Sequence, residues 1–282
     1  MDISVMADTF DAWVDDALSW ISDNGDWVFD PFRAALEGAY NGVLWLLQLP
    51  PFYVIALIGA LLGWRLINAW AGALAGVALV FCSVMGLWDQ TTSTFALVVT
   101  ATILALLVGI PIGIVAGFVR WFDRALEPVL DLIQTLPPYI YLLPAIALLG
   151  FGPATALVAT FVVAMPPAIR LTALGIRMTP HPFIELGHAS GLTSWQMFVK
   201  IRLPFAIPSV MAGINQSLMM AFGMVVIAGI VGSGGLGETI YGAIRTLDIA
   251  TSINAAIAIV ILTMVLDRLT QSAAQRTEGR AK

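Results

Sequence analysis

Few residues in this 282-residue chain belong to the types that carry out acid–base, nucleophilic or metal chemistry. The single cysteine, Cys82, lies in the apolar run VALVFCSVMGLW, so no intrachain disulfide can form and we expect a packing or lipid-facing role. The two histidines, His181 and His188, lack the HExxH spacing of a zinc site, and we expect them at a surface or interface. Paired carboxylates and a Ser/His/Asp set are also missing from the apolar runs. The sequence therefore predicts neither a metal site nor catalytic residues.

A second set of candidate residues is polar and lies within or beside long apolar runs. Such groups can hydrogen-bond between helices, at about 0.6–2 kcal/mol each, or they can line the path of a solute. Residue type alone does not choose between these roles, although we expect a few of the set to line a path. The candidates for a translocation path are Gln134, Thr135, Tyr139, Asn215 and Gln216.

The run GSGGLG at residues 232–237 is rich enough in glycine to form a phosphate-binding loop. Such loops follow a strand and open a helix, whereas this one follows an apolar run. The topology derived below also places it on the outer side, where nucleotide is absent. We expect a tight re-entrant or outer-gate turn made by Gly232, Gly234, Gly235 and Gly237.

The composition places most of the chain in lipid. Hydrophobic residues make up 59% and charged residues 11%, against about 45–50% and about 25% in soluble proteins. Apolar runs of roughly 20 residues can cross a bilayer as helices, which predicts an all-α membrane protein of about seven spans. The run near residue 140 holds three prolines, so we expect it to be kinked or broken. The predicted spans are 41–64, 66–88, 94–119, 132–151, 153–176, 205–231 and 250–267.

The distribution of Lys and Arg predicts the orientation, because these residues stay on the cytoplasmic side of short loops. If the first span runs from outside to inside, all of the 13 Lys and Arg residues except Arg33 and Arg245 lie in the cytoplasm or at its face. The sequence therefore predicts an N-out, C-in topology. Asp, Glu, Lys and His, which commonly couple ion-driven transporters, are missing from the centres of the spans. Energy for uphill transport would then enter from outside the bilayer.

Residues 1–40 are acidic and lack the basic start and apolar core of a cleavable signal peptide. Their tryptophans and aspartates fall largely on opposite helical faces, which predicts an interfacial helix on the outer leaflet. We expect this outer-face amphipathic or scaffold segment to precede a transmembrane domain at 41–282. A cage of Trp13, Trp20 and Trp27 for a cationic ligand is an alternative, but the heptad spacing suits a surface stripe better.

The stretch ELGHASGLTSWQMFVKIRLP is too short and too polar to cross a bilayer. Pro180 suits a helix start, Gly191 can take the left-handed conformation that ends a helix, and Thr193 or Ser194 can cap the next. We expect the second helix to close at Pro204. The resulting cytoplasmic helix–turn–helix has enough apolar surface to need a partner, although its two basic residues could equally anchor it among lipid headgroups.

This stretch resembles the cytoplasmic signature of binding-protein-dependent ABC importer permeases, written EAA, three residues, G, nine residues, I-x-LP. The spacing matches, while Leu186 and Gly187 stand in place of two alanines. In that family the segment docks in a groove of the ATPase subunit. The resemblance implies that residues 180–204 form a coupling segment and that a separate ATPase chain holds ATP and Mg. The implied coupling residues are Glu185, Gly187, Gly191, Ile201, Leu203 and Pro204.

The resemblance extends over about residues 90–250. The runs QTLPPYIYLLPAIALLGFG, MPPAIRLTALGI and AGINQSLMMAFGMVVIAGIVGSGGLGETI resemble the permease subunit of glycine betaine and proline betaine importers. This implies the type I ABC importer permease fold in the cytoplasmic (inner) membrane of a prokaryote. The implied partners are a second permease copy, two ATPase subunits and an extracytoplasmic solute-binding protein, with no nucleic acid. A methionine- or phosphonate-type permease and a stand-alone facilitator or channel remain as alternatives.

Overall fold

The computed structural model describes residues 3–280, and within them every regular element is a helix. The predicted all-α class is therefore confirmed. In chain order the elements are α1 (Ile3–Gln48), α2 (Phe52–Leu66), α3 (Ala69–Val84), α4 (Trp88–Phe118), α5 (Arg120–Thr135), η1 (Pro138–Tyr141), α6 (Leu142–Leu149), α7 (Pro153–Arg177), α8 (His181–Ala189), α9 (Ser194–Met197), η2 (Phe198–Arg202), α10 (Leu203–Ala228), η3 (Gly229–Val231), α11 (Gly235–Thr246) and α12 (Ile249–Arg280).

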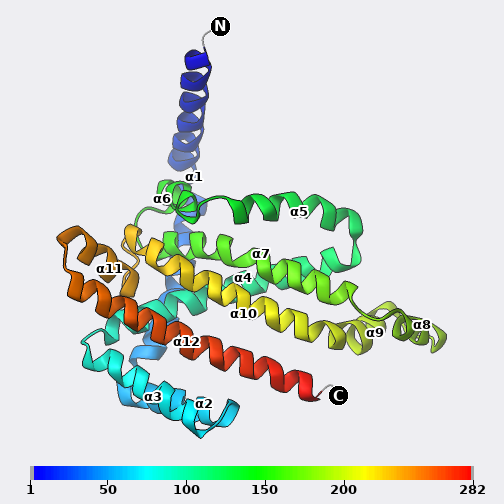
Figure 1. The fold of residues 1–282 in the computed structure, drawn as a ribbon. Coiled ribbons are helices and arrows are strands. Elements are labelled where there is room, and N and C mark those ends of the chain that lie inside the picture. Colours follow the sequence, from blue (N-terminus) through cyan, green and yellow to red (C-terminus); the bar gives the residue numbers. More distant parts are fainter. Residues whose placement is uncertain (1–2, 281–282) are drawn as a thin grey trace.

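The long helices α4, α7, α10 and α12 run along one another, with α5 beside α7 (Figure 1). The short helices α8 and α9 and the end of α12 lie at one end of this bundle, while α11 lies at the other. The sequence placed the coupling segment and the glycine-rich turn on opposite sides of the membrane, and the structure places them at opposite ends of the bundle. Which end faces the cytoplasm remains a prediction.

Four helices among the described residues are long and apolar enough to cross a bilayer unbroken. They are Trp88–Phe118, Pro153–Arg177, the continuous stretch Ser194–Val231 and Ile249–Ser272. Each corresponds to a predicted span. Two bent helix pairs could add one crossing each, which gives up to six, so the count of seven is not confirmed. The predicted span 66–88 contains α3, which has 16 residues.

The predicted span 41–64 is wrong as a single helix. Residues up to Gln48 continue α1, and the chain then turns by 91° at Pro50 and Pro51 into α2. A proline cannot continue the backbone hydrogen bonds of a helix, so the adjacent pair explains the corner. Figure 1 shows α1 crossing the bundle helices steeply, with its first half projecting beyond them. This direction agrees with a helix lying along the membrane surface, although α1 does not break at the boundary predicted at residue 40.

The predicted span 132–151 is broken, as its prolines indicated. Its two parts, α5 and η1–α6, meet at 104°. Leu136 takes the extended conformation that a following proline favours, so α5 ends there. The charged face of α5 packs on α7, where Arg170 pairs with Asp131 at 2.5 Å and Arg177 pairs with Asp123. Because these pairs are substantially exposed, they orient α5 more than they stabilise the fold.

Glycines on α4 let its backbone come close to α7. A Cβ atom at Gly113 would lie 2.6 Å from the carbonyl oxygen of Ile169. Gly109 and Gly117, one turn to either side, meet α7 in the same way, with a Cβ atom at 2.9 Å and 2.7 Å from its nearest neighbour. Small residues at four-residue spacing are the usual means of close helix packing in lipid, where van der Waals contact replaces the hydrophobic drive.

The distribution of residue sizes is consistent with lipid as the solvent. Most fully buried positions on α4 and α7 are alanine, threonine or glycine, as at Ala101 and Ala156. Large apolar side chains instead point outward, including Leu107 and Val84. An apolar surface of this extent fits contact with acyl chains or with other apolar protein surfaces.

Replacing Gly113 with Ala tests the backbone approach between α4 and α7. The added methyl meets a backbone oxygen that cannot move aside, so we expect a loss of about 1–3 kcal/mol and a lower Tm of the purified protein in nanodiscs. Gly223→Ala on α10 is the matched control, because nothing lies within 4 Å of its Cβ position. Equal Tm values for the two variants would contradict this account of the packing.

Candidate functional site

The coupling segment begins with α8, which starts directly after Pro180, where the sequence predicted a helix start. Glu185 is exposed and its Oε1 lies 3.1 Å from Nδ1 of His181, one turn earlier. Leu186, where the family signature has alanine, is 60% exposed. The exposed face of α8 therefore presents a carboxylate and a branched apolar side chain.

The two glycines of the signature have different physical roles. Gly187 is buried, and a Cβ atom there would lie 2.5 Å from Cε of Met197 and 2.9 Å from Cδ1 of Ile201, so α8 packs closely on the helix that follows. Gly191 has φ +70°, the left-handed conformation predicted for it. The Leu192 N–H donates to the Gly187 carbonyl at 3.0 Å, which closes the turn as a Schellman motif.

The second helix starts with a capping box at Thr193. Its hydroxyl accepts from the Gln196 N–H, and the Gln196 side chain accepts from the Thr193 N–H. The prediction that this helix closes at Pro204 is wrong. The stretch Phe198–Arg202 is π-helical, and the Leu203 N–H donates to the Phe198 carbonyl five residues back. This wider turn accommodates the proline without a break.

Aromatic contacts fix one side of the coupling segment to the bundle. The rings of Phe183 and Phe205 lie 4.8 Å apart, which joins α8 to the start of α10. The Arg202 guanidinium lies 4.8 Å from the centre of the Phe118 ring at the end of α4. Trp195 is 71% exposed, with its ring 5.6 Å from that of Phe198. The segment is thus anchored to the bundle by Phe183 and Arg202, while Leu186 and Trp195 remain largely exposed.

The glycine-rich turn lies at the opposite end of the bundle, and its role as an outer gate remains a prediction. Gly232, Gly234 and Gly235 have φ between +70° and +78°. Gly237 is needed for a different reason, because a Cβ atom there would lie 2.1 Å from the carbonyl oxygen of Val225 on α10. Sequence reasoning missed Thr94, whose buried hydroxyl accepts from the Leu236 N–H at 2.8 Å and so ties α11 to α4.

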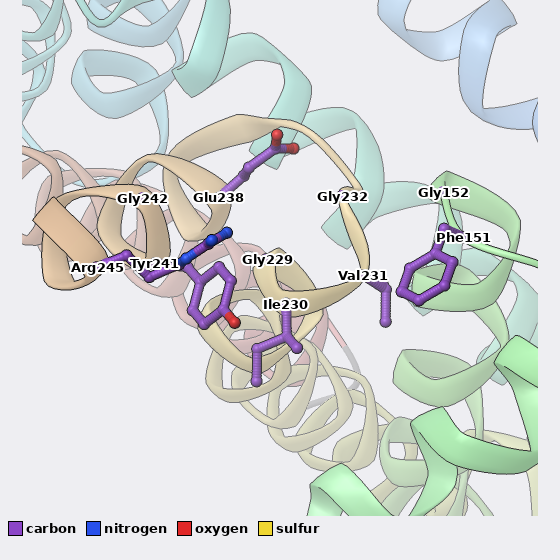
Figure 2. Close-up of a pocket in the computed structure, with 10 residues that line it drawn as sticks. All are labelled: Phe151, Gly152, Gly229, Ile230, Val231, Gly232, Glu238, Tyr241, Gly242 and Arg245. Carbon is purple, nitrogen blue, oxygen red and sulfur yellow. The ribbon is translucent and has the colours of Figure 1, made fainter.

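A cavity of about 380 Å³ opens beside this turn (Figure 2). Its walls come from the loop before α7, from η3 and from α11. Phe151 lies across from Tyr241, and Glu238 and Arg245 complete the set of polar and aromatic groups. The Gly152 N–H donates to the Val231 carbonyl at 2.9 Å, which joins the two sides.

Three charged residues at this end of the bundle differ in their partners. Arg33 pairs with Glu37 at 2.8 Å, and the carboxylate raises the pKa of the Arg33 guanidinium. Asp248 accepts from the Thr251 hydroxyl and N–H at the start of α12, and these bonds lower the pKa of the Asp248 carboxyl. Arg245 forms no ion pair with any carboxylate whose side chain the structure describes.

The candidate path residues fall into two groups. Gln134, Thr135 and Tyr139 lie around the bend between α5 and η1 and are exposed. Asn215 instead accepts from the Thr270 hydroxyl at 2.8 Å, which joins α10 to α12, and Gln216 beside it is exposed. For Asn215 the structure shows the interhelical bond that was the alternative to path lining. The path assignment of the five residues remains a prediction.

The fold and these two sites define a polytopic membrane protein with a helical segment beyond one end of its bundle. Residues 109–279 match the family described as binding-protein-dependent transport system inner membrane component. The match covers more than half of the chain, and the chain belongs to this family. The resemblance noted in the sequence is thereby confirmed at the level of the family.

Curated relatives extend the likeness over nearly the whole chain. The glycine betaine/proline betaine transport system permease protein ProW of Escherichia coli is 36% identical over 270 residues, or 96% of this chain and 76% of the relative. The glycine betaine transport system permease protein OpuAB of Bacillus subtilis is 38% identical over 275 residues, or 98% and 96%. These relatives are permease proteins, which agrees with the prediction that this chain is not an enzyme.

Solved structures of the MetNI methionine ABC transporter in inward-facing conformations share the fold. One crystal form has a TM-score of 0.59 at 22% identity, covering 70% of this chain and 96% of the other. A second has a TM-score of 0.57 at 24% identity, covering 67% and 93%. The predicted type I ABC importer permease fold is therefore confirmed, and identity at this level shows the fold alone.

Substitution of Gly237 by Ala tests the outer turn. The methyl would overlap the backbone of α10, so we expect the free energy of unfolding to fall by about 3 kcal/mol, measured as a lower Tm in nanodiscs. Gly242→Ala, five residues along the same helix, has nothing within 4 Å of its Cβ position and serves as the control. A Gly237→Ala protein as stable as this control would show that α10 and α11 do not depend on their close approach.

Proposed function

We propose that this chain is the membrane-spanning subunit of an ATP-driven importer for glycine betaine, proline betaine or a related quaternary-amine solute. The observation that carries the proposal is the packing of α8, which holds the start of the family signature. Gly187 lets α8 pack closely on a helix that continues unbroken from Ser194 to Val231. The names of the relatives in Escherichia coli and Bacillus subtilis support the solute class.

In this proposal the working assembly contains two copies of the chain, two ATPase subunits that carry ATP and Mg, and an extracytoplasmic solute-binding protein. A symmetric pair would leave the path at or near the interface between the copies. The assembly lies in the cytoplasmic membrane with the N-terminus outside, α8 and α9 inside, and the segment 1–40 along the outer face. The chain itself supplies path and coupling, and it carries out no hydrolysis.

Closure of the ATPases around ATP would bring the two coupling segments together. Because α8 packs on Met197 and Ile201, it would carry the start of the long helix with it. At 1.5 Å per residue the 38 residues of this helix span about 57 Å, so a rotation at its inner end would displace the turn at Gly229–Gly237. Hydrolysis would then reset the bundle as one rigid body. The pair of Glu185 and His181, one turn apart on α8, would help to hold that helix in shape.

Of the alternative functions, a methionine permease is favoured only by likeness of fold, because the two methionine transporter structures are 22–24% identical to this chain. A stand-alone facilitator would need no partner for α8. Co-purification with an ATPase chain separates it from an importer subunit.

Reconstitution of the permease with its ATPase and binding protein in vesicles tests the proposal. We expect ATP-dependent accumulation of radiolabelled glycine betaine, abolished by a non-hydrolysable ATP analogue and inhibited by unlabelled proline betaine but not by methionine. Accumulation without ATP would favour a facilitator, and competition by methionine would favour the other permease class.

Replacing Gly191 with Val tests the coupling role of the turn after α8. A β-branched residue in the left-handed conformation costs about 1–2 kcal/mol, so we expect the turn to shift and uptake to fall severalfold while ATP hydrolysis continues. Gly191→Asn is the matched control, because asparagine tolerates this conformation. Nothing lies within 4 Å of the Cβ position, so strain and not a clash separates the two variants. Unchanged uptake in the valine variant would contradict the docking role.

A further inference from the structure

We propose that the cavity beside the outer turn is a subsite for a small zwitterion that carries both a methylated ammonium and a carboxylate. The inference rests on the proposed function for its solute class, but its argument comes from the cavity. A volume of about 380 Å³ lies within the range of small-molecule pockets, about 300–1,000 Å³. The cavity also lies at the end of the bundle where an imported solute would enter.

Arg245 is the group for the carboxylate. Its side chain folds back over the Tyr241 ring, with Cζ 5.8 Å from the ring centre (Figure 2). This contact holds the guanidinium at the cavity wall, and no carboxylate among the described side chains forms an ion pair with it. A planar guanidinium binds a carboxylate through two parallel hydrogen bonds, which lysine cannot do.

Aromatic faces and one carboxylate are the groups for the ammonium. Phe151 is 68% exposed and lies across the cavity from Tyr241, so a methylated ammonium could contact an aromatic face on either wall. Glu238 adds negative charge on the same helix. Its Oε2 accepts from the Gly234 N–H at 2.7 Å, which fixes the carboxylate at the turn.

The spacing of the charges favours a zwitterion over a simple ion. Glu238 and Arg245 lie seven residues apart on α11, two turns or about 10.5 Å of helix rise, and the fold of Arg245 over Tyr241 brings its guanidinium back toward the acid. A lone cation would meet Arg245 and a lone anion would meet Glu238. Only a solute with both charges can pair with the Glu238 carboxylate and the Arg245 guanidinium together.

The cavity is also placed to respond to transport. One wall is the loop at Phe151 and Gly152 before α7, and the other is η3 and α11. The hydrogen bond from Gly152 to Val231 joins these walls, and η3 directly continues the long helix that starts in the coupling segment. Movement of that helix would therefore alter the subsite, which could admit solute in one state and release it in the next.

Saturation-transfer NMR on the permease–ATPase complex in nanodiscs, without the binding protein, tests the subsite directly. The probes are glycine betaine and choline, which shares the trimethylammonium group but lacks the carboxylate. We expect transfer to the betaine methyl protons and about tenfold weaker betaine binding in Arg245→Gln, with choline binding unchanged or improved. Tyr241→Leu should weaken both probes, and Arg245→Lys should restore betaine binding in part.

Thr246→Ala, next to Arg245 but outside the cavity wall, is the matched control and should bind as the unaltered protein does. Equal betaine binding in Arg245→Gln and this control, or no transfer to betaine at all, would overturn the subsite. Vesicle uptake by the same preparations separates the two proposals. Betaine uptake with no transfer in the NMR experiment overturns the subsite alone, whereas arginine-dependent transfer without ATP-driven uptake overturns the importer function alone.

Discussion

The bundle depends on how closely the backbones of α4, α7, α10 and α11 approach one another. In lipid, apolar side chains gain little by leaving their surroundings, so helices associate through van der Waals contact and a few hydrogen bonds. Gly113 brings α4 onto α7, Gly175 brings α7 onto α10, and Gly229 meets Gly237 where α10 and α11 cross. At each point an added Cβ atom would lie within 2.8 Å of a neighbouring atom. Small residues therefore replace the interlocking large side chains of a soluble core.

The same contacts would stiffen the bundle along the direction in which the proposed coupling acts. A single helix runs from the capping box at Thr193 to the turn at Gly232, and it is held by α7 along much of its length. Polar groups add hydrogen bonds between helices near the ends of the bundle, such as the one from the Leu236 N–H to the Thr94 hydroxyl. Helices with such contacts move together as one rigid body. This suits a protein that must transmit a conformational change from one side of a membrane to the other without charged groups at its centre.

Hydropathy and local backbone chemistry predicted much of this molecule. The spans 94–119, 153–176, 205–231 and 250–267 are continuous helices because apolar length alone decides a crossing. The left-handed Gly191 followed from its place after a short helix. The predicted span 41–64 was wrong as a single helix because hydropathy indicates that residues contact apolar surroundings and does not indicate the direction of a helix.

The remaining features depend on contacts that residue order does not show. The stop expected at Pro204 is absent because a π-helical turn absorbs the proline, and no local pattern announced that turn. Thr94 lies 142 residues from its partner Leu236, and the cavity takes walls from three separate segments, so both emerge only once the chain has folded.

The direction of α1 is another feature that residue order does not show. A rod of 46 residues, about 69 Å long, that lies across the bundle gives the molecule a lateral footprint far wider than its transmembrane cross-section. The density at which copies of the protein can pack in a membrane would then be limited by the area that α1 covers, and not by the area of the membrane-spanning helices.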